Sequence, residues 1–219
     1  MKFVPWSYSR LNAYETCPKK YFHVNVQKSA REKPNEKTDY GTMVHQAFAT
    51  YLTKGTMLPL SLRHHQKMLE ALRAQPGEHV VEQKAALNNQ FAPTGYFDED
   101  VWVRVISDLT ILQKRRALTI DWKTGKMSED FTQLRLVGAV LFQLAPELDV
   151  VRMSYVWTQN RQITSRQMDR AAAMETWREF LPRVKRYQAA HEATDFPARQ
   201  NPFCKYCPVT SCPYNDANR

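Results

Sequence analysis

All four cysteines of this 219-residue chain lie near its two ends. Cys17 stands alone near the start, and Cys204, Cys207 and Cys212 form a C-x2-C-x4-C cluster close to the end. In a cytosolic protein, cysteines clustered in this way are typical of metal ligands rather than of disulfides. A four-thiolate site here needs Cys17 as its fourth ligand. Such a site would join the two terminal segments and restrict the unfolded chain. Unrelated free thiols are the alternative.

The number of cysteines does not separate zinc from an iron–sulfur cluster, because both accept four thiolates. Zinc ribbons usually contain two closely spaced C-x2-C pairs, whereas here one ligand is distant and the tail spacing is uneven. In either case we expect the metal to have a structural role.

The chain is basic, with 31 Lys and Arg against 22 Asp and Glu and a net charge of +9. This excess favours an anionic partner, and nucleic acid first, although a merely basic protein is the alternative. No run of about 18 apolar residues predicts a membrane span. The opening residues lack the apolar core of a signal peptide, so we expect a cytoplasmic protein without a membrane partner.

Hydrophobic periodicity and turn residues predict a mixed α/β domain. A charged turn at 113–116 joins two predicted strands into a hairpin, and Pro182 would bend the last helix. We expect a loop over 28–40 and an irregular tail from Phe196. The predicted helices cover 7–22, 41–52, 60–74, 132–144 and 165–190, and the predicted strands cover 78–87, 101–112, 117–123 and 150–158.

The second strand of the hairpin carries the chemistry. In Ile120-Asp121-Trp122-Lys123, strand alternation places Asp121 and Lys123 on one face and the two apolar residues on the other. The carboxylate can hold a divalent cation, and the ammonium can position water or stabilise charge on phosphorus. An exposed strand often carries such a pair without any function, so the motif depends on its surroundings.

Two further residues strengthen that motif. Asp108 ends the preceding strand, where it can share one or two Mg²⁺ or Mn²⁺ ions with Asp121. His45 lies among apolar residues of a predicted helix, so a hydrogen-bonded core histidine is the alternative to a metal ligand.

These motifs together resemble the RecB-like branch of the PD-(D/E)XK nuclease superfamily. More narrowly, they resemble the iron–sulfur nucleases represented by AddB and by CRISPR-associated RecB-like exonucleases. The resemblance covers essentially the whole chain. In chain order its motifs are Ser7-x-Ser9-x-Leu11-x-x-Tyr14-x-x-Cys17-Pro18-x-x-Tyr21, Gly41-x-x-x-His45, Asp108, Ile120-Asp121-Trp122-Lys123-Thr124-Gly125, Gln133 and the three C-terminal cysteines.

The resemblance implies a restriction-endonuclease-like core, a mixed central sheet flanked by helices, with the terminal segments joined by a metal cluster on the four cysteines. It implies one nuclease domain over 1–219, with the cluster region at 1–25 and 196–219 and a helical insert and core at 41–190. The implied metal ligands for Mn²⁺ or Mg²⁺ are His45, Asp108, Asp121 and the main-chain carbonyl of Trp122. Lys123 would be the catalytic lysine, Gln133 would place the DNA strand, and Cys17, Cys204, Cys207 and Cys212 would bind a [4Fe-4S] cluster.

Two positions depart from the family pattern. Val137 stands where a tyrosine is expected four residues after Gln133, and Ser107 replaces the glycine often found before the second-motif aspartate. Neither change removes a metal ligand, so we expect an active metal-dependent deoxyribonuclease, with single-stranded DNA exonuclease activity in recombination or repair. The alternative is a non-catalytic or partner-dependent nucleic-acid-binding subunit, working with a helicase or recombinase.

Basic and aromatic residues supply candidate DNA contacts. We expect the charged turn Lys114-Arg115-Arg116 to bind phosphates without sequence preference, although a solvated face is the alternative. Five aromatic residues can stack on bases or belong to the core, and for Trp102 we favour the core. They are Trp6, Tyr8, Tyr96, Phe97 and Trp102.

Overall fold

The computed structural model describes residues 3–32 and 36–215. The chain divides into two compact units, one of residues 1–34 with 179–219 and the other of residues 35–178. The subdivision into a cluster region and a nuclease core within one domain stays a prediction. No helix among the described residues is long and apolar enough to cross a membrane.

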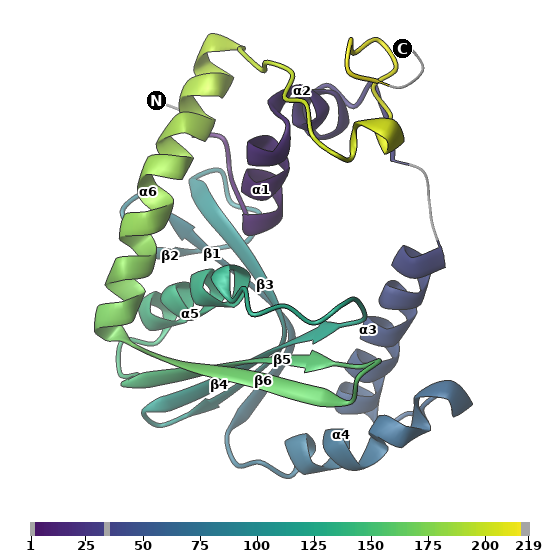
Figure 1. The fold of residues 1–219 in the computed structure, drawn as a ribbon. Coiled ribbons are helices and arrows are strands. Elements are labelled where there is room, and N and C mark those ends of the chain that lie inside the picture. Colours follow the sequence, from purple (N-terminus) through teal and green to yellow (C-terminus); the bar gives the residue numbers. More distant parts are fainter. Residues whose placement is uncertain (1–2, 33–35, 216–219) are drawn as a thin grey trace. The chain divides into compact units, whose positions relative to one another are not determined.

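The larger unit contains one six-stranded sheet in the order β2-β1-β3-β4-β5-β6 (Figure 1). Neighbouring strands are antiparallel except for the parallel pair β4 and β5. This is the mixed sheet that the sequence predicts. The strands are β1 (Glu78–Asn88), β2 (Pro93–Thr94), β3 (Val101–Gln113), β4 (Arg116–Lys123), β5 (Val150–Trp157) and β6 (Gln162–Asp169).

Helix α5 (Thr132–Leu144) connects the two parallel strands, as a parallel pair requires a crossover. Eight of its residues are buried, from Leu134 to Phe142, which confirms the prediction of a buried helix over 132–144. A separate apolar cluster joins side chains of the sheet, including Ile120 and Trp122, to the helices before β1. Those helices are α3 (Glu36–Lys54), the short 3-10 segment η2 (Leu60–His65) and α4 (Gln66–Arg73).

Several boundaries differ from the predictions, and two of these differences, at the starts of helices, have a local physical cause. Helix α3 begins at Glu36 rather than at Gly41, because Glu36 and Asp39 place negative charge in its first turn. The predicted helix over 165–190 begins instead at Arg170, in α6 (Arg170–Ala193), and residues 165–169 belong to the edge strand β6. The Asp169 carboxylate accepts a hydrogen bond from the N–H of Ala172 at 2.8 Å, as an N-cap does.

The smaller unit contains the N-terminal helices and the C-terminal part of α6, within which Pro182 lies. The Ser7 hydroxyl accepts a hydrogen bond from the N–H of Arg10 at 3.4 Å, which confirms the predicted serine cap. Trp6 is fully buried and stacks on Phe180 with ring centroids 5.5 Å apart. The short elements are α1 (Tyr8–Thr16), α2 (Pro18–Tyr21), the π-helical turn η1 (Phe22–Val26) and the 3-10 turn η3 (Cys204–Tyr206).

Candidate active site

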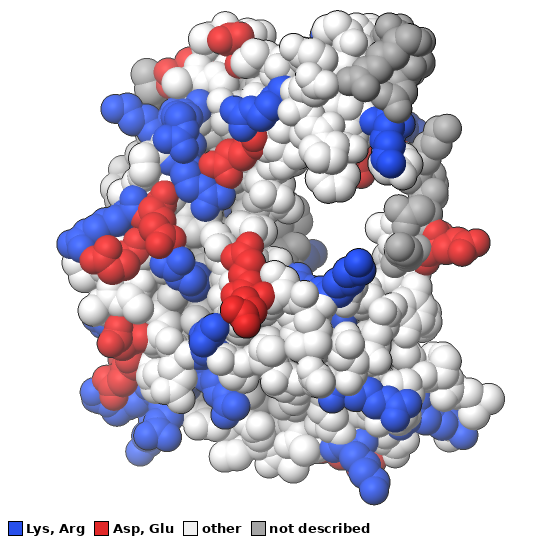
Figure 2. Space-filling view, viewed as in Figure 1, with Lys and Arg blue, Asp and Glu red and all other residues white. Residues whose placement is uncertain are grey.

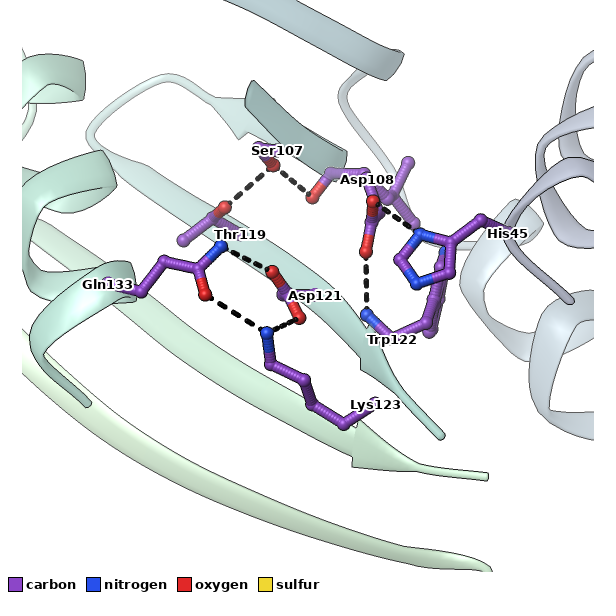
Figure 3. Close-up of polar contacts among 9 residues, drawn as sticks. His45, Ser107, Asp108, Thr119, Asp121, Trp122, Lys123 and Gln133 are labelled. Atoms are coloured by element: carbon purple, nitrogen blue, oxygen red, sulfur yellow. Dashed lines mark hydrogen bonds and ion pairs between the residues drawn. The ribbon is translucent and has the colours of Figure 1, made fainter. Parts of the chain in front are cut away.

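The candidate site lies where β3 and β4 stop pairing. Their regular pairing ends at Leu109 with Ile120, so Asp108 is the first residue of β3 beyond the paired region. Its Oδ2 accepts a hydrogen bond from the main-chain N–H of Trp122 at 2.7 Å (Figure 3). This bond fixes the carboxylate of one strand to the backbone of the next, so that both strands contribute to one site.

His45 approaches the same carboxylate from helix α3. Its Nδ1 lies 2.9 Å from Asp108 Oδ1, and the hydrogen bond orients the imidazole toward the sheet (Figure 3). This hydrogen bond raises the pKa of His45, although desolvation acts in the opposite direction. His45 is therefore tied to a carboxylate, and it is not a histidine of the apolar core.

Glu82 of β1 lies close to His45 and Asp108, and it was not among the site residues predicted from the sequence. Within the described part of the chain, His45, Glu82 and Asp108 form the one group of three or more His, Cys, Asp or Glu side chains whose ligand atoms all lie within 4.8 Å of one another. Glu82 has a backbone φ of 52°, which is uncommon for a residue other than glycine. Partial desolvation raises the pKa of its carboxyl, and the negative charge of Asp108 adds to the rise.

Asp121, Lys123 and Gln133 form a closed triangle of polar contacts (Figure 3). Lys123 Nζ lies 2.7 Å from Asp121 Oδ2 and donates to Gln133 Oε1 at 3.0 Å. The Gln133 amide nitrogen donates to Asp121 Oδ1 at 3.0 Å. One glutamine at the start of α5 thus fixes both the carboxylate and the ammonium.

The Asp121 side chain is only 9% exposed, and this burial raises the pKa of its carboxyl to about 6. Lys123 opposes the rise and Asp108 adds to it. A cation bound here would add a second positive partner to this buried carboxylate besides Lys123.

The model of the PD-(D/E)XK nuclease superfamily matches residues 5–213. The chain belongs to the PD-(D/E)XK nuclease superfamily. Nucleic acid is therefore its class of substrate. Nucleases of this superfamily typically use a divalent metal, and His45, Glu82 and Asp108 form a candidate site for one. No curated protein matches the chain significantly.

Comparison with a solved structure supports the fold. A crystal structure from Eubacterium rectale, described as a "putative exonuclease", aligns with a TM-score of 0.55 at 11% identity and covers 100% of this chain and 88% of that chain. The crystal structure of SSO0001 aligns with a TM-score of 0.41 at 13% identity, covering 98% of this chain and 88% of that chain. At that TM-score the second likeness carries no argument about the fold.

Nuclease chemistry requires oxygen and imidazole ligands for a hard divalent cation, and the donors of this site fit that requirement. Asp108 bonds to both His45 and the Trp122 backbone, so it links the α3 side of the site to β4. The sequence predicts that alternate side chains of β4 lie on opposite faces of the sheet, and the structure confirms it. Ile120 and Trp122 lie in the apolar cluster. Asp121 and Lys123 lie on the other face, in the polar triangle. Val137, which stands where a tyrosine is expected, is buried in α5.

The basic turn Lys114-Arg115-Arg116 lies at the other end of the β3–β4 hairpin from the acidic residues. Five residues of strand separate Arg116 from Asp121, which corresponds to about 17 Å. Arg115 pairs with Asp149 through two hydrogen bonds of 2.5 Å, so its guanidinium is already engaged. Positive and negative side chains are interspersed over the face shown in Figure 2 rather than gathered into one patch.

The four cysteines line one cavity in the smaller unit of this nuclease, and they form no disulfide. Two of the sulfurs accept main-chain hydrogen bonds, Cys17 from Arg199 at 3.5 Å and Cys204 from Asn201 at 3.4 Å. Burial raises the pKa of the Cys207 thiol, and the neighbouring Cys17 and Cys212 act in the same direction. In the described chain no three cysteine sulfurs lie within 4.8 Å of one another, so the thiols do not form the compact set that one metal ion needs.

Proposed function

We propose that this superfamily member is a metal-dependent deoxyribonuclease that acts as an exonuclease on single-stranded DNA. The observation that carries the proposal is the triangle of Asp121, Lys123 and Gln133 beside the hydrogen-bonded pair His45 and Asp108. These contacts bring a carboxylate pair, an imidazole and an ammonium to the fork between two strands. The raised pKa of the buried Asp121 carboxyl, about 6, also supports a functional site.

The metal ligands in this proposal are His45, Asp108, Asp121 and the main-chain carbonyl of Trp122, with Glu82 beside them. The ion would be Mg²⁺ or Mn²⁺, since both prefer such oxygen-rich sites. When bound, it would act as a Lewis acid on the phosphoryl group and lower the pKa of water in the site.

The protein groups have separate tasks. Lys123 would hold the attacking water and stabilise negative charge that develops on the phosphoryl oxygens, because its ammonium is a compact donor. Gln133 would hold Lys123 in place through its Oε1 and would contact the DNA strand when that strand displaces one of its hydrogen bonds. Asp108 would position Asp121 indirectly, through the main chain of Trp122.

We further propose that the four cysteines bind a [4Fe-4S] cluster rather than zinc. A tetrahedral zinc site with Zn–S bonds of about 2.3 Å holds its sulfurs about 3.8 Å apart. All four cysteines line one shared cavity, which supports a single group held by all of them. The main-chain hydrogen bonds to Cys17 and Cys204 also support a cluster, since such bonds tune iron–sulfur centres.

Exonuclease action, a single-stranded substrate and a role in recombination or repair rest on the resemblance to RecB-like nucleases. A helicase or recombinase would then supply the unwound strand, because the chain has no G-x-x-x-x-G-K-[ST] loop for ATP-driven unwinding.

The experiment compares end-labelled linear and circular single-stranded DNA, using anaerobically purified protein with Mn²⁺ or Mg²⁺. We expect the linear strand to be degraded and the circle to survive, and Asp121→Ala to abolish degradation. Cleavage of the circle would replace the exonuclease proposal with an endonuclease. DNA binding without any cleavage would favour the alternative of a binding subunit.

A further inference from the structure

The loop between β2 and β3 carries the exposed ring of Phe97 beside the half-buried ring of Tyr96. Phe97 is 79% exposed, and its ring meets that of Tyr96 edge to face with centroids 5.0 Å apart. The other large aromatic residue singled out near this loop, Trp102, is only 5% exposed and belongs to the core as predicted.

The loop is held in one conformation by its own polar contacts. Asp98 accepts hydrogen bonds from the Gly95 N–H at 2.8 Å and from the Thr94 hydroxyl at 3.2 Å. The Thr94 hydroxyl also lies 2.6 Å from Asp100. A Cβ on Gly95 would lie 2.6 Å from the Asp98 carboxylate, so a larger residue there would displace this carboxylate. Asp98 and Asp100, two of the three acidic residues after Phe97, therefore stabilise the conformation of the loop.

Two cations flank the ring pair. Arg104 donates from Nε to the Tyr96 carbonyl at 2.7 Å, and its guanidinium lies 5.4 Å from the centre of the Tyr96 ring. Lys84 Nζ lies 5.9 Å from the Tyr96 ring and 5.8 Å from the Phe97 ring. The rings and the cations together form what we call the aromatic platform, defined by Lys84, Tyr96, Phe97 and Arg104.

The platform continues the row of side chains that leads to the candidate active site. Lys84 pairs with Ile106 across β1 and β3, and Ala86 pairs with Arg104, so these side chains share a face of the sheet. Lys84 is two residues from Glu82, and its charge acts on the Glu82 carboxyl. Ile106, two residues from Asp108, is 43% exposed between the site and the platform.

We propose that the aromatic platform binds single-stranded DNA beside the scissile phosphate, with bases stacked on Phe97 and Tyr96 and phosphates at Lys84 and Arg104. Four residues of strand separate Arg104 from Asp108, or about 13 Å. A stacked strand advances about 3.4 Å per nucleotide, so the platform meets bases about four nucleotides or fewer from the site of cleavage. Stacking on aromatic rings is tolerant of sequence, as a nuclease without sequence preference needs.

This inference rests on the proposed nuclease function, so its test has one arm with catalysis and one without. The first arm measures KM and kcat for a single-stranded oligonucleotide and for a nitrophenyl ester of thymidine monophosphate, which is too small to reach the platform. The second arm measures binding of the labelled oligonucleotide by fluorescence anisotropy in EDTA. The variants are Phe97→Ala, Phe97→Tyr, which keeps an aromatic ring, and Leu60→Ala, a control whose side chain is 77% exposed.

We expect Phe97→Ala to raise KM and the dissociation constant for the oligonucleotide about fivefold or more. We expect its kcat and its activity on the ester to stay near those of the wild type, and Phe97→Tyr to restore binding. Equal oligonucleotide binding by Phe97→Ala and Leu60→Ala would overturn the inference. A wild type that cleaves neither substrate would refute the proposed function instead. The anisotropy measurement would still show whether the aromatic platform binds single-stranded DNA.

Discussion

Glu82 and Asp108 occupy opposing positions on β1 and β3, between the regular pairs Val81–Leu109 and Gln83–Ser107. Their ligand atoms lie within 4.8 Å of each other and of His45. The φ of 52° at Glu82 is the local distortion that accompanies this approach. Two carboxylates held so close repel each other unless a cation or a proton lies between them.

Replacing Glu82 with glutamine should weaken metal binding without removing the metal. The amide cannot supply the negative charge that attracts the cation, so we expect about a tenfold loss of Mn²⁺ affinity. The rate at saturating Mn²⁺ should stay close to that of the wild type if Glu82 supports binding alone. Mn²⁺ titration by calorimetry, together with the metal dependence of cleavage, measures both quantities.

Glu82→Gly is the matched control for the backbone. Glycine accepts a positive φ at little cost, so this variant should unfold at the same temperature as the wild type or higher while losing the same metal affinity. A Glu82→Gln variant with unchanged Mn²⁺ affinity would show that Glu82 is not a ligand.

Gln133→Leu should remove the two hydrogen bonds that hold Asp121 and Lys123 in position, while both of these side chains remain present. The amide is the common partner of Asp121 and Lys123, and loss of a residue that orients such groups typically lowers activity about 10- to 100-fold. Thr132→Ala, one residue earlier in α5, is the control and should keep wild-type kcat. Equal activity of the two variants would contradict the orienting role of Gln133.

Stability should fall on acidification because of a buried histidine in the helical layer. Burial lowers the pKa of His65 to about 4, whereas the unfolded value is near 6.5, and its ring packs against Phe48 with centroids 5.3 Å apart. Between these two pH values His65 binds a proton in the unfolded chain but not in the folded state. Stability is therefore lost as the pH falls from about 6.5 toward 4. This contribution of His65 should reach about 2 kcal/mol at pH 5, and the buried Asp121 carboxyl, whose pKa is raised to about 6, offsets part of it.

Denaturant unfolding at pH 7 and pH 5 measures that loss. We expect His65→Leu to show a smaller difference between the two pH values than the wild type. His23, which belongs to the other compact unit, serves as the control, and His23→Leu should keep the wild-type difference. The same pH dependence in all three proteins would assign the acid sensitivity to other groups.

Cys17→Ala should yield colourless protein that is less stable or insoluble, because the loss of one thiolate opens the proposed [4Fe-4S] site. Iron, sulfide and zinc contents of the purified wild type and variant measure the outcome. Wild-type protein that contains one zinc and no iron would contradict the cluster. A Cys17→Ala variant with normal colour and yield would contradict the joining of the two terminal segments.

The local motifs of the site could be read from the sequence. The alternation around Asp121 and Lys123 fixes which of them face the site, and Gln133 begins a helix that directly follows them. Asp108 could be placed because the hairpin turn sets the register of β3 against β4. In each case the signal lies within a few residues of chain or within one turn.

Features that depend on distant pairing could not be read in this way. Glu82 lies in a polar stretch of β1, and its role depends on the interrupted pairing with β3 rather than on a pattern in its own strand. Strand β6 is a mostly exposed edge strand, so it lacks an alternating apolar signal. Asp169 could have marked the true start of α6, since an aspartate before a run of alanines is a frequent N-cap.

In the proposed function, Lys123 and the carboxylates around it hydrolyse DNA. The most direct measurement is the single-turnover cleavage rate of linear single-stranded DNA in Mn²⁺ for wild type, Lys123→Met and Lys126→Met, with Mn²⁺ binding measured on the same samples. We predict that Lys123→Met binds Mn²⁺ but cleaves at least about 1,000-fold more slowly, while Lys126→Met, altered in the exposed segment after β4, keeps the wild-type rate. A Lys123→Met variant that cleaves as fast as the wild type would contradict the account.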